Sequence, residues 1–343
     1  MRIAIVNDMS LAVEGLVRII KNSSEHELAW IAYNGQQAIE ACQRDVPDLI
    51  LMDVMMPKLG GVQATRHIMQ QTPCPILIVT ASIHRNSDLV FEAMCAGAMD
   101  AVVTPRLLSD KTGYDAETLL HKIRMIDVLT RDSRPFSPHA EVQLQEINTL
   151  NYHKHLVVIG SSSGGPDALA KIFSAVPRNS AASFVVIQHV DQQFAPGLAH
   201  WLNDRSPISV GLALENETPL AGKVYIACGN NHLIINKKGV FEYAEEPWET
   251  FYRPSVDVFF SSVARYWRGT VTAILLTGMG KDGAQGLLEL RHGGAKTIAQ
   301  DRLTSAVYGM PKVAAEIGAA QEIKSIDEIA GLLAMGFSTK TAK

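Results

Sequence analysis

Short apolar runs alternate with helix-like stretches through residues 1–125, and this alternation restricts the fold more than any other feature of the chain. Five apolar runs have the length of buried strands: "RIAIV", "LAWIAY", "DLILMD", "PILIVTAS" and "DAVVTP". A stretch with helical periodicity follows each of them, the last being "AETLLHKIRMIDVLT". Strands and helices that alternate in this way are joined by right-handed crossovers and form a parallel sheet with helices on both faces. We therefore predict an α/β domain of the (βα)5 type.

The alternation stops near residue 131 and resumes near residue 155. The segment between them has two prolines, many polar residues and no clear period, which is typical of a linker. Strand candidates then return at "HLVVIG", "SFVVIQHV", "KVYIAC", "HLIIN" and "TVTAILLTG". A chain of 343 residues is longer than one hydrophobic core usually serves. We predict an N-terminal domain at 1–130, a linker at 131–155 and a larger α/β domain at 156–337.

The composition is that of an ordinary soluble protein. Hydrophobic residues make up 47% of the chain, charged residues make up 19%, and the formal net charge is −4. This net charge argues against nucleic-acid binding through a basic face, with a local basic patch as the alternative, so we expect no nucleic-acid partner. The start "MRIAIVNDMS" is unlike a signal peptide, and no apolar run approaches the about 20 residues of a membrane span. We expect a cytoplasmic protein without direct membrane insertion, whose cysteines are reduced core residues: Cys42, Cys74, Cys95 and Cys228.

Polar residues follow three strands of the first predicted sheet. Asp8 follows the first strand, Asp53 ends the third, and Thr80 ends the fourth. Ligands of parallel α/β sheets bind at the carboxyl ends of the strands, so Asp8 and Asp53 should converge on one crevice. Two carboxylates suit a hard divalent cation such as Mg²⁺, which could neutralise a phosphoryl group during its transfer to a carboxylate. The alternative is that these aspartates only cap helices or turns.

A serine-rich turn opens the second predicted domain. "GSSSG" fits the nucleophile-elbow pattern G-x-S-x-G, with Ser162 at its centre. The turn is not G-x-G-x-x-G and lacks the lysine of a P-loop, which disfavours dinucleotide and nucleoside triphosphate sites. Anion binding at the following helix N-terminus is the alternative to a catalytic serine.

A nucleophilic serine needs a base and an acid that orients it. His189 ends the next apolar run, and Asp282 follows the run "VTAILLTG" in a glycine-rich loop. Ser162, His189 and Asp282 would therefore gather at one edge of a parallel sheet. Their order along the chain differs from that of the α/β-hydrolases. Other assignments stay open at this point, with His232 as the base and with Asp257 or Asp301 as the acid.

Two further segments have plainer interpretations. The segment Arg253–Asp257 could contact a substrate, but we favour capping of the following helix by Ser255. The segment "EEPWETFY", at 245–252, could be an acidic and aromatic patch, but we favour a solvated loop.

The first domain resembles the receiver domain of two-component response regulators over its whole length. The resemblance implies that Asp53 is the phospho-acceptor and that Thr80 contacts the phosphoryl group. It also implies that Asp8, Asp53 and the backbone carbonyl of Met55 hold Mg²⁺. The sequence departs from the receiver pattern at three positions: Asn7 replaces an acidic residue, Thr104 a lysine, and Ala101 an aromatic residue. The lost lysine removes a charge-assisted contact to the phosphoryl group, and a pseudo-receiver is the alternative.

The second domain resembles the catalytic domain of the CheB family, the chemoreceptor glutamate methylesterases. The matching stretches are "IGSSSGGPDAL", "VVIQHV", "YRPSVDVFFSSVA", "LLTGMGKDGAQGLLELRHGGAKTIAQD" and "TSAVYGMPKVAAE". The resemblance implies a doubly wound parallel sheet and the triad Ser162, His189 and Asp282. It further implies hydrolysis of glutamate γ-methyl esters with release of methanol and no cofactor for that step. Some members of the family also deamidate glutamines.

The same resemblance implies the partners: a methyl-accepting chemoreceptor cytoplasmic domain as substrate and a CheA-type histidine kinase as phosphodonor. In its opening "VNDMSLAVEGL" and its absent lysine, the chain resembles a branch of the CheB family that acts in surface-sensing, Wsp-type pathways. There the methylesterase would set the output of a cyclic-di-GMP pathway. Two alternatives of other classes are a non-catalytic receptor-binding regulator with a degenerate receiver and a serine esterase acting on small metabolites.

Overall fold

The computed structural model describes residues 1–105, 114–131, 155–248, 250 and 252–337. The chain divides into two compact units, Met1–Arg134 and Pro135–Lys343, which we call the N-terminal and the C-terminal unit. Most of the linker predicted at 131–155 lies outside the described residues. Within the described part of the chain, no helix combines the length and the apolar character that crossing a bilayer requires.

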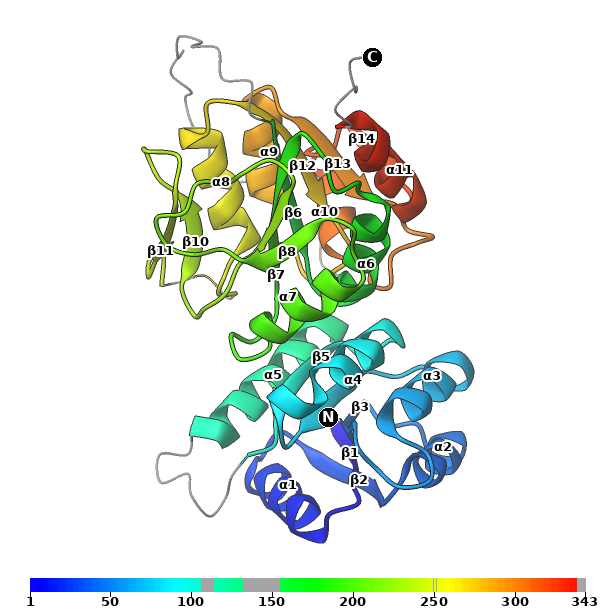
Figure 1. Ribbon diagram of the computed structural model, residues 1–343. Helices are drawn as coiled ribbons and strands as arrows, with labels where there is room; N and C mark the ends of the chain where they lie inside the picture. The colour runs from blue at the N-terminus through cyan, green and yellow to red at the C-terminus, as the bar shows by residue number, and fades with distance from the viewer. Residues whose placement is uncertain (106–113, 132–154, 249, 251, 338–343) are drawn as a thin grey trace. The chain divides into compact units, whose positions relative to one another are not determined.

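The N-terminal unit is a parallel sheet of the order β2-β1-β3-β4-β5 between two groups of helices (Figure 1). Its strands are β1 (Arg2–Val6), β2 (Glu27–Ala32), β3 (Leu49–Asp53), β4 (Ile76–Thr80) and β5 (Asp100–Val103). Its helices are α1 (Ser10–Asn22), α2 (Gly35–Arg44), α3 (Gly61–Gln71), α4 (Ile83–Cys95) and α5 (Tyr114–Arg131). Apolar side chains of α1 and α5 pack together on one face, and α2, α3 and α4 lie side by side on the other. The predicted (βα)5 architecture is confirmed.

The C-terminal unit contains a parallel sheet of the order β14-β13-β12-β6-β7-β9-β8. Its strands are β6 (His155–Ser161), β7 (Ala182–Gln188), β8 (Ser209–Leu212), β9 (Lys223–Ile226), β12 (Thr270–Leu275), β13 (Lys296–Gln300) and β14 (Glu322–Lys324). The chain first builds outward from β6 through β7 and later returns to add β12 on the other side. Such a reversal of strand order opens a crevice at the carboxyl ends of the strands, where ligands of doubly wound folds bind.

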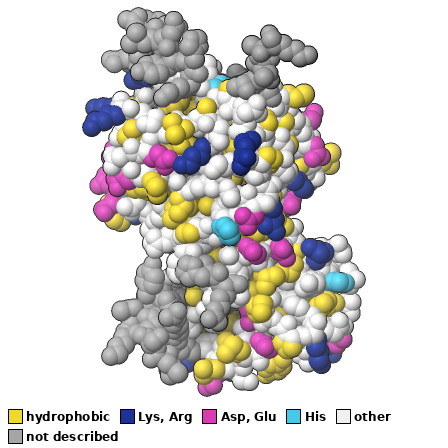
Figure 2. All heavy atoms as spheres, viewed as in Figure 1, with side chains coloured by type: hydrophobic (Ala, Val, Ile, Leu, Met, Phe, Trp, Pro, Cys, Tyr) yellow, Lys and Arg dark blue, Asp and Glu magenta, His cyan; other side chains and the backbone are white. Residues whose placement is uncertain are grey.

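Helices cover both faces of this sheet, as expected for a doubly wound fold. They are α6 (Gly165–Ala175), α7 (Ala195–Asp204), α8 (Val256–Tyr266), α9 (Ala284–His292), α10 (Met310–Glu316) and α11 (Ile326–Gly336). Helix α6 packs beside α7 and α11, whereas α8, α9 and α10 form a second group whose apolar side chains share a core with the sheet. On the face drawn in Figure 2, charged side chains of both signs are interspersed with hydrophobic ones over this unit.

The strand prediction for the C-terminal unit was incomplete. The run "HLIIN" is not in the main sheet, because β10 (His232–Ile235) pairs with β11 (Phe241–Ala244) as an antiparallel hairpin. The sequence pattern did not indicate β8, β11, β13 or β14. Strand β13, "KTIAQ", carries polar side chains that are buried because they form hydrogen bonds, such as Thr297 to the Ala319 carbonyl at 2.8 Å. Polar residues of this kind interrupt the apolar run by which a buried strand is recognised.

The core of the C-terminal unit predicts a clear effect of truncating one aromatic side chain. Phe173 and Phe184 are fully buried and pack edge to face, with ring centroids 5.8 Å apart. We expect Phe173→Ala to lower the free energy of unfolding by about 3–5 kcal/mol, because it removes buried area and leaves a cavity. Urea denaturation followed by tryptophan fluorescence measures this loss.

The control is Leu303→Ala, since the Leu303 side chain is 93% exposed. That variant should stay within about 0.5 kcal/mol of the wild type. Equal effects of the two substitutions would contradict the packing described above.

Candidate active site

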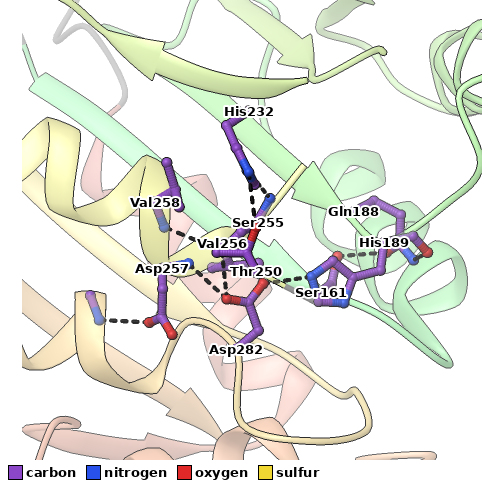
Figure 3. A network of polar contacts seen from close by, with 11 residues as sticks. Ser161, Gln188, His189, His232, Thr250, Ser255, Val256, Asp257, Val258 and Asp282 are labelled. Carbon is purple, nitrogen blue, oxygen red and sulfur yellow. Dashed lines mark hydrogen bonds and ion pairs between the residues drawn. The ribbon is translucent and has the colours of Figure 1, made fainter. Parts of the chain in front are cut away.

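The carboxylate of Asp282 accepts hydrogen bonds from the first turn of α8 and contacts one histidine (Figure 3). The donors at α8 are the Ser255 hydroxyl (2.8 Å), the Val256 amide (2.7 Å) and the Asp257 amide (3.1 Å), and His189 Nε2 lies 2.7 Å from Asp282 Oδ2. Burial opposes ionisation of Asp282, but the hydrogen bonds and the charge of His189 outweigh it and keep the pKa of Asp282 below its ordinary value. The donors at the N-terminus of α8 therefore offset the free-energy cost of burying the ionised carboxylate of Asp282.

His189 has one engaged ring nitrogen and one without a partner. Nε2 contacts Asp282, whereas Nδ1 is buried and has no hydrogen-bond partner among the described residues. The imidazole is nearly enclosed, because its side chain is only 7% exposed and the Tyr252 ring stacks on its face. A carboxylate on Nε2 favours the tautomer with its proton on that nitrogen. Nδ1 is then the nitrogen able to accept a proton.

The register of β6 and β7 brings the serine turn next to His189. Ser161 pairs with Gln188, so Ser162 and His189 follow adjacent positions on neighbouring parallel strands. The Gln188 amide donates to the backbone carbonyls of Ser162 (2.9 Å) and His189 (3.1 Å) and thereby ties the two strand ends together. Its Oε1 accepts from the Ser161 hydroxyl at 2.7 Å. Ser161 therefore has a structural role in the turn.

The Ser162 side chain is left unengaged by this network. The Ser162 amide donates to the Thr277 carbonyl at 3.0 Å, but its hydroxyl forms no hydrogen bond within the described residues. Gly164 allows the sharp turn, since its φ of +77° is a conformation that side-chain-bearing residues rarely adopt. At Gly165 a Cβ atom would lie 2.0 Å from the Gln188 oxygen, so only glycine fits there.

The alternative base, His232, is fully buried and has both ring nitrogens engaged. Nδ1 accepts from the Ser255 amide at 3.2 Å, and Nε2 contacts the Pro247 carbonyl at 3.2 Å. Burial is the main cause that lowers the pKa of His232, so the ring is neutral near pH 7. His232 thus supports the residue that caps α8 and is not placed to act as a base.

Neither alternative acid forms a hydrogen bond or ion pair with His189 in the described part of the chain. Asp301 accepts hydrogen bonds from the amide and the hydroxyl of Thr304, at 2.9 and 2.5 Å, and so stabilises a local turn. Asp257 accepts from the Gly286 amide at 2.7 Å. Burial, together with the nearby charge of Asp282, raises the pKa of Asp257 to about 7. Among the three candidate acids, the structure brings Asp282 to the histidine.

The capping interpretation of Ser255 is confirmed, and the interpretation of 245–252 as a solvated loop is wrong for Tyr252. Ser255 is the N-cap of α8 and accepts from the Val258 amide at 3.3 Å. Trp248 is exposed, but the Tyr252 ring lies parallel to the His189 ring, with centroids 3.9 Å apart and an interplanar angle of 4°. No sequence pattern distinguishes such a tyrosine from an aromatic residue of a surface loop.

The acidic site of the N-terminal unit lies at the carboxyl ends of β1 and β3. Asp53 is buried and accepts from the Asn7 side-chain amide at 3.1 Å and from the Met55 amide at 3.3 Å, whereas Asp8 is exposed. Burial raises the pKa of Asp53 to about 6, and the charge of Asp8 adds to this effect. A cation would relieve the repulsion between the two carboxylates, so these oxygen ligands fit Mg²⁺. Asn7 occupies one Asp53 oxygen as a donor, which an acidic residue would not do.

Thr80 lies at the end of β4 with its hydroxyl engaged. The Asn86 side-chain amide donates to Thr80 Oγ1 at 3.0 Å. Thr104 donates its backbone amide to the Thr80 carbonyl at 2.9 Å and brings no positive charge to the site. The Thr80 hydroxyl donates to the Ser82 carbonyl at 3.5 Å, so a phosphoryl group at Asp53 would compete with that carbonyl for the hydroxyl proton.

Comparisons with known proteins agree with both units. Residues 157–333 match the family model "CheB methylesterase", and residues 3–109 match "Response regulator receiver domain". A protein-glutamate methylesterase/protein-glutamine glutaminase of Mesorhizobium japonicum is 47% identical, over 96% of this chain and 96% of its own length. A protein of Pseudomonas aeruginosa with the same name, number 3, is 47% identical over 98% of this chain and 100% of its own. The CheB methylesterase catalytic domain of Thermotoga maritima is 36% identical, with a TM-score of 0.51, and covers 53% of this chain and 97% of its own.

The raised pKa of Asp53 predicts a pH-dependent stability difference. A carboxyl whose pKa is raised in the folded state costs stability as the pH rises through that pKa. We expect Asp53→Asn to stabilise the N-terminal unit by about 2 kcal/mol at pH 8 and by about 1 kcal/mol less at pH 5. Urea denaturation at the two pH values, followed by fluorescence of Trp30, measures the difference. A gain that does not change with pH would contradict burial as the cause of the shift.

Proposed function

The chain belongs to the CheB methylesterase family, and we propose that Ser162, His189 and Asp282 hydrolyse glutamate γ-methyl esters of a protein substrate. By class the chain is a protein-glutamate methylesterase with a receiver domain, and its curated relatives also bear the name protein-glutamine glutaminase. The observation that carries the proposed roles is the 2.7 Å contact between His189 Nε2 and Asp282, which leaves Nδ1 of the same ring to serve Ser162.

The proposed reaction needs no group beyond these side chains and water. His189 Nδ1 accepts the Ser162 proton while the serine oxygen attacks the ester carbonyl. Asp282 keeps the proton on Nε2 and stabilises the imidazolium that forms. The imidazolium then protonates the departing methoxide, which leaves as methanol. A water molecule, deprotonated by the same Nδ1, attacks the acyl-serine, and the imidazolium returns this proton to the departing Ser162 oxygen as the glutamate product is released. With a glutamine amide the same steps would release ammonia.

The tetrahedral intermediate carries an oxyanion that backbone amides can stabilise. The amides of Gly164 and Met279 have no hydrogen-bond acceptor among the described residues. Both lie on the turns that carry Ser162 and Asp282. These two amides are the candidate hydrogen-bond donors to the oxyanion. Gly164 lies in the loop before α6, and Met279 lies in the Met279–Gly280 loop.

The proposed regulation acts through Asp53 as phospho-acceptor. Asp8, Asp53 and the carbonyl of Met55 would hold Mg²⁺, which supplies charge neutralisation of the phosphoryl oxygens. Thr80 would donate its hydroxyl proton to the phosphoryl group in place of its bond to the Ser82 carbonyl. We propose that a CheA-type histidine kinase supplies the phosphoryl group, that phosphorylation raises esterase activity, and that the substrate is a chemoreceptor cytoplasmic domain, so that the reaction takes place in the cytoplasm.

A non-catalytic receptor-binding regulator is the competing function. The substitutions Asn7 and Thr104 favour it for the receiver, since they change the surroundings of Asp53. The ordered contacts of Asp282 and His189 favour an enzyme, because buried ionisable groups are costly to keep without a function. The experiment below separates the two.

Methanol release from a methylated receptor cytoplasmic fragment tests the proposed roles. We expect Ser162→Ala to lower kcat by about three or more orders of magnitude, while the matched Ser161→Ala retains substantial activity. A small phosphodonor with Mg²⁺ should stimulate the wild type but not Asp53→Ala. Absence of methanol release by the wild type under both conditions would support the binding-only regulator.

The contact between Ser255 and Asp282 predicts a loss of activity that exceeds any loss of stability. Ser255 and Ser325 are both N-caps with side-chain hydrogen bonds, at α8 and α11, but only Ser255 donates to Asp282. Each alanine substitution should cost about 1 kcal/mol of folding stability. Ser255→Ala should also lower kcat by about 10-fold or more, because a charge-assisted hydrogen bond to the acid is lost. Equal activities of the two variants would show that Ser255 acts only as a cap.

A further inference from the structure

The segment between β11 and α8 is anchored on one buried histidine. His232 Nε2 contacts the Thr250 hydroxyl at 3.0 Å, and His232 Nδ1 accepts from the Ser255 amide at 3.2 Å. The Thr250 hydroxyl also donates to the Pro247 carbonyl at 3.0 Å. Tyr252 lies between the two anchored residues, so its backbone position is restricted from both sides.

This anchored segment places the Tyr252 ring flat against the ring of His189. The centroid separation of 3.9 Å with an interplanar angle of 4° shows two parallel, stacked rings. Two neutral rings in such a stack gain mainly the modest energy of an ordinary aromatic contact. An imidazolium gains more, since a cation over a tyrosine face is attracted by the ring quadrupole, especially where water is excluded. The stack therefore favours the charged form that the reaction creates.

We propose that Tyr252 is a positioning residue for the esterase, which fixes the plane of the His189 ring and stabilises its protonated form. The inference rests on the proposed function of His189 as the base. Asp282 fixes one edge of the imidazole through Nε2, but a single contact at one edge leaves the ring free to rotate about that bond. A second ring packed on its face removes that freedom.

Other titratable or charged groups of this part of the unit act in different ways. They are Asp282 at Nε2, Asp257 beside it on α8, the neutral His232 on β10, and Arg253, which follows Tyr252. Arg253 is directed to Trp248, with its guanidinium 4.3 Å from the ring centroid and a hydrogen bond to the Trp248 carbonyl at 2.9 Å. None of these groups covers the face of the imidazole, so the effect of Tyr252 can be separated from theirs.

The test compares Tyr252→Leu, which removes the aromatic face, with Tyr252→Phe, which keeps it, in the full chain with phosphodonor and Mg²⁺. We expect Tyr252→Leu to lower kcat by about 3- to 30-fold with little change in KM. The acid limb of its pH–rate profile should move to lower pH, because the imidazolium has lost a stabilising contact. Tyr252→Phe should recover most of the activity and the wild-type profile.

The matched control is Tyr266→Leu, which removes a half-buried tyrosine of the same unit that packs against the hydrophobic core instead of His189. It should leave the pH profile unchanged. The inference is overturned if Tyr252→Leu keeps the wild-type kcat and profile, or if Tyr252→Phe is as impaired as Tyr252→Leu. Titration of the His189 ring by NMR gives the same comparison without substrate, so a failure of the stack is distinguished from a failure of the proposed esterase function.

Discussion

The buried carboxylate of Asp282 is the interaction on which the catalytic arrangement depends. A carboxylate in a protein interior is costly unless charges and hydrogen bonds compensate it. Here the N-terminus of α8 supplies three donors, and His189 supplies the fourth contact. The start of α8, the loop after β12 and the end of β7 must therefore all be in place for Asp282 to ionise. A fold that satisfies this carboxylate also fixes the position of His189 Nε2.

The site contains two aspartates that differ in pKa and two histidines that differ in hydrogen bonding. Asp282 is kept ionised by its donors, whereas burial and the neighbouring charge raise the pKa of Asp257 to about 7. His232 has both nitrogens engaged, whereas His189 keeps Nδ1 without a partner. Different surroundings give identical side chains different protonation states, which allows them to have different roles in one site. The supporting members, His232 and Asp257, hold the first turn of α8 and its contact with α9 in position.

The positions of the principal residues could be predicted from the sequence because they follow from periodicity. Apolar runs mark the strands, and parallel strands bring their carboxyl ends together, so Ser162, His189 and Asp53 were expected near their observed places. The contacts of Tyr252 and Asn7 could not be predicted, because they depend on where a loop or a side-chain amide points after folding. The short strand β13 could not be predicted, because its polar Thr297 is satisfied by tertiary hydrogen bonds that no local pattern reveals.

The tautomer of His189 tests the central claim most directly. In protein labelled with ¹⁵N at histidine, and with the His189 signals assigned by comparison with His189→Gln, nitrogen chemical shifts near neutral pH distinguish protonated from unprotonated ring nitrogens. The account predicts a proton on Nε2 and none on Nδ1, together with loss of this single state in Asp282→Ala. A proton on Nδ1, or the same spectrum with and without Asp282, would contradict the role given to that carboxylate.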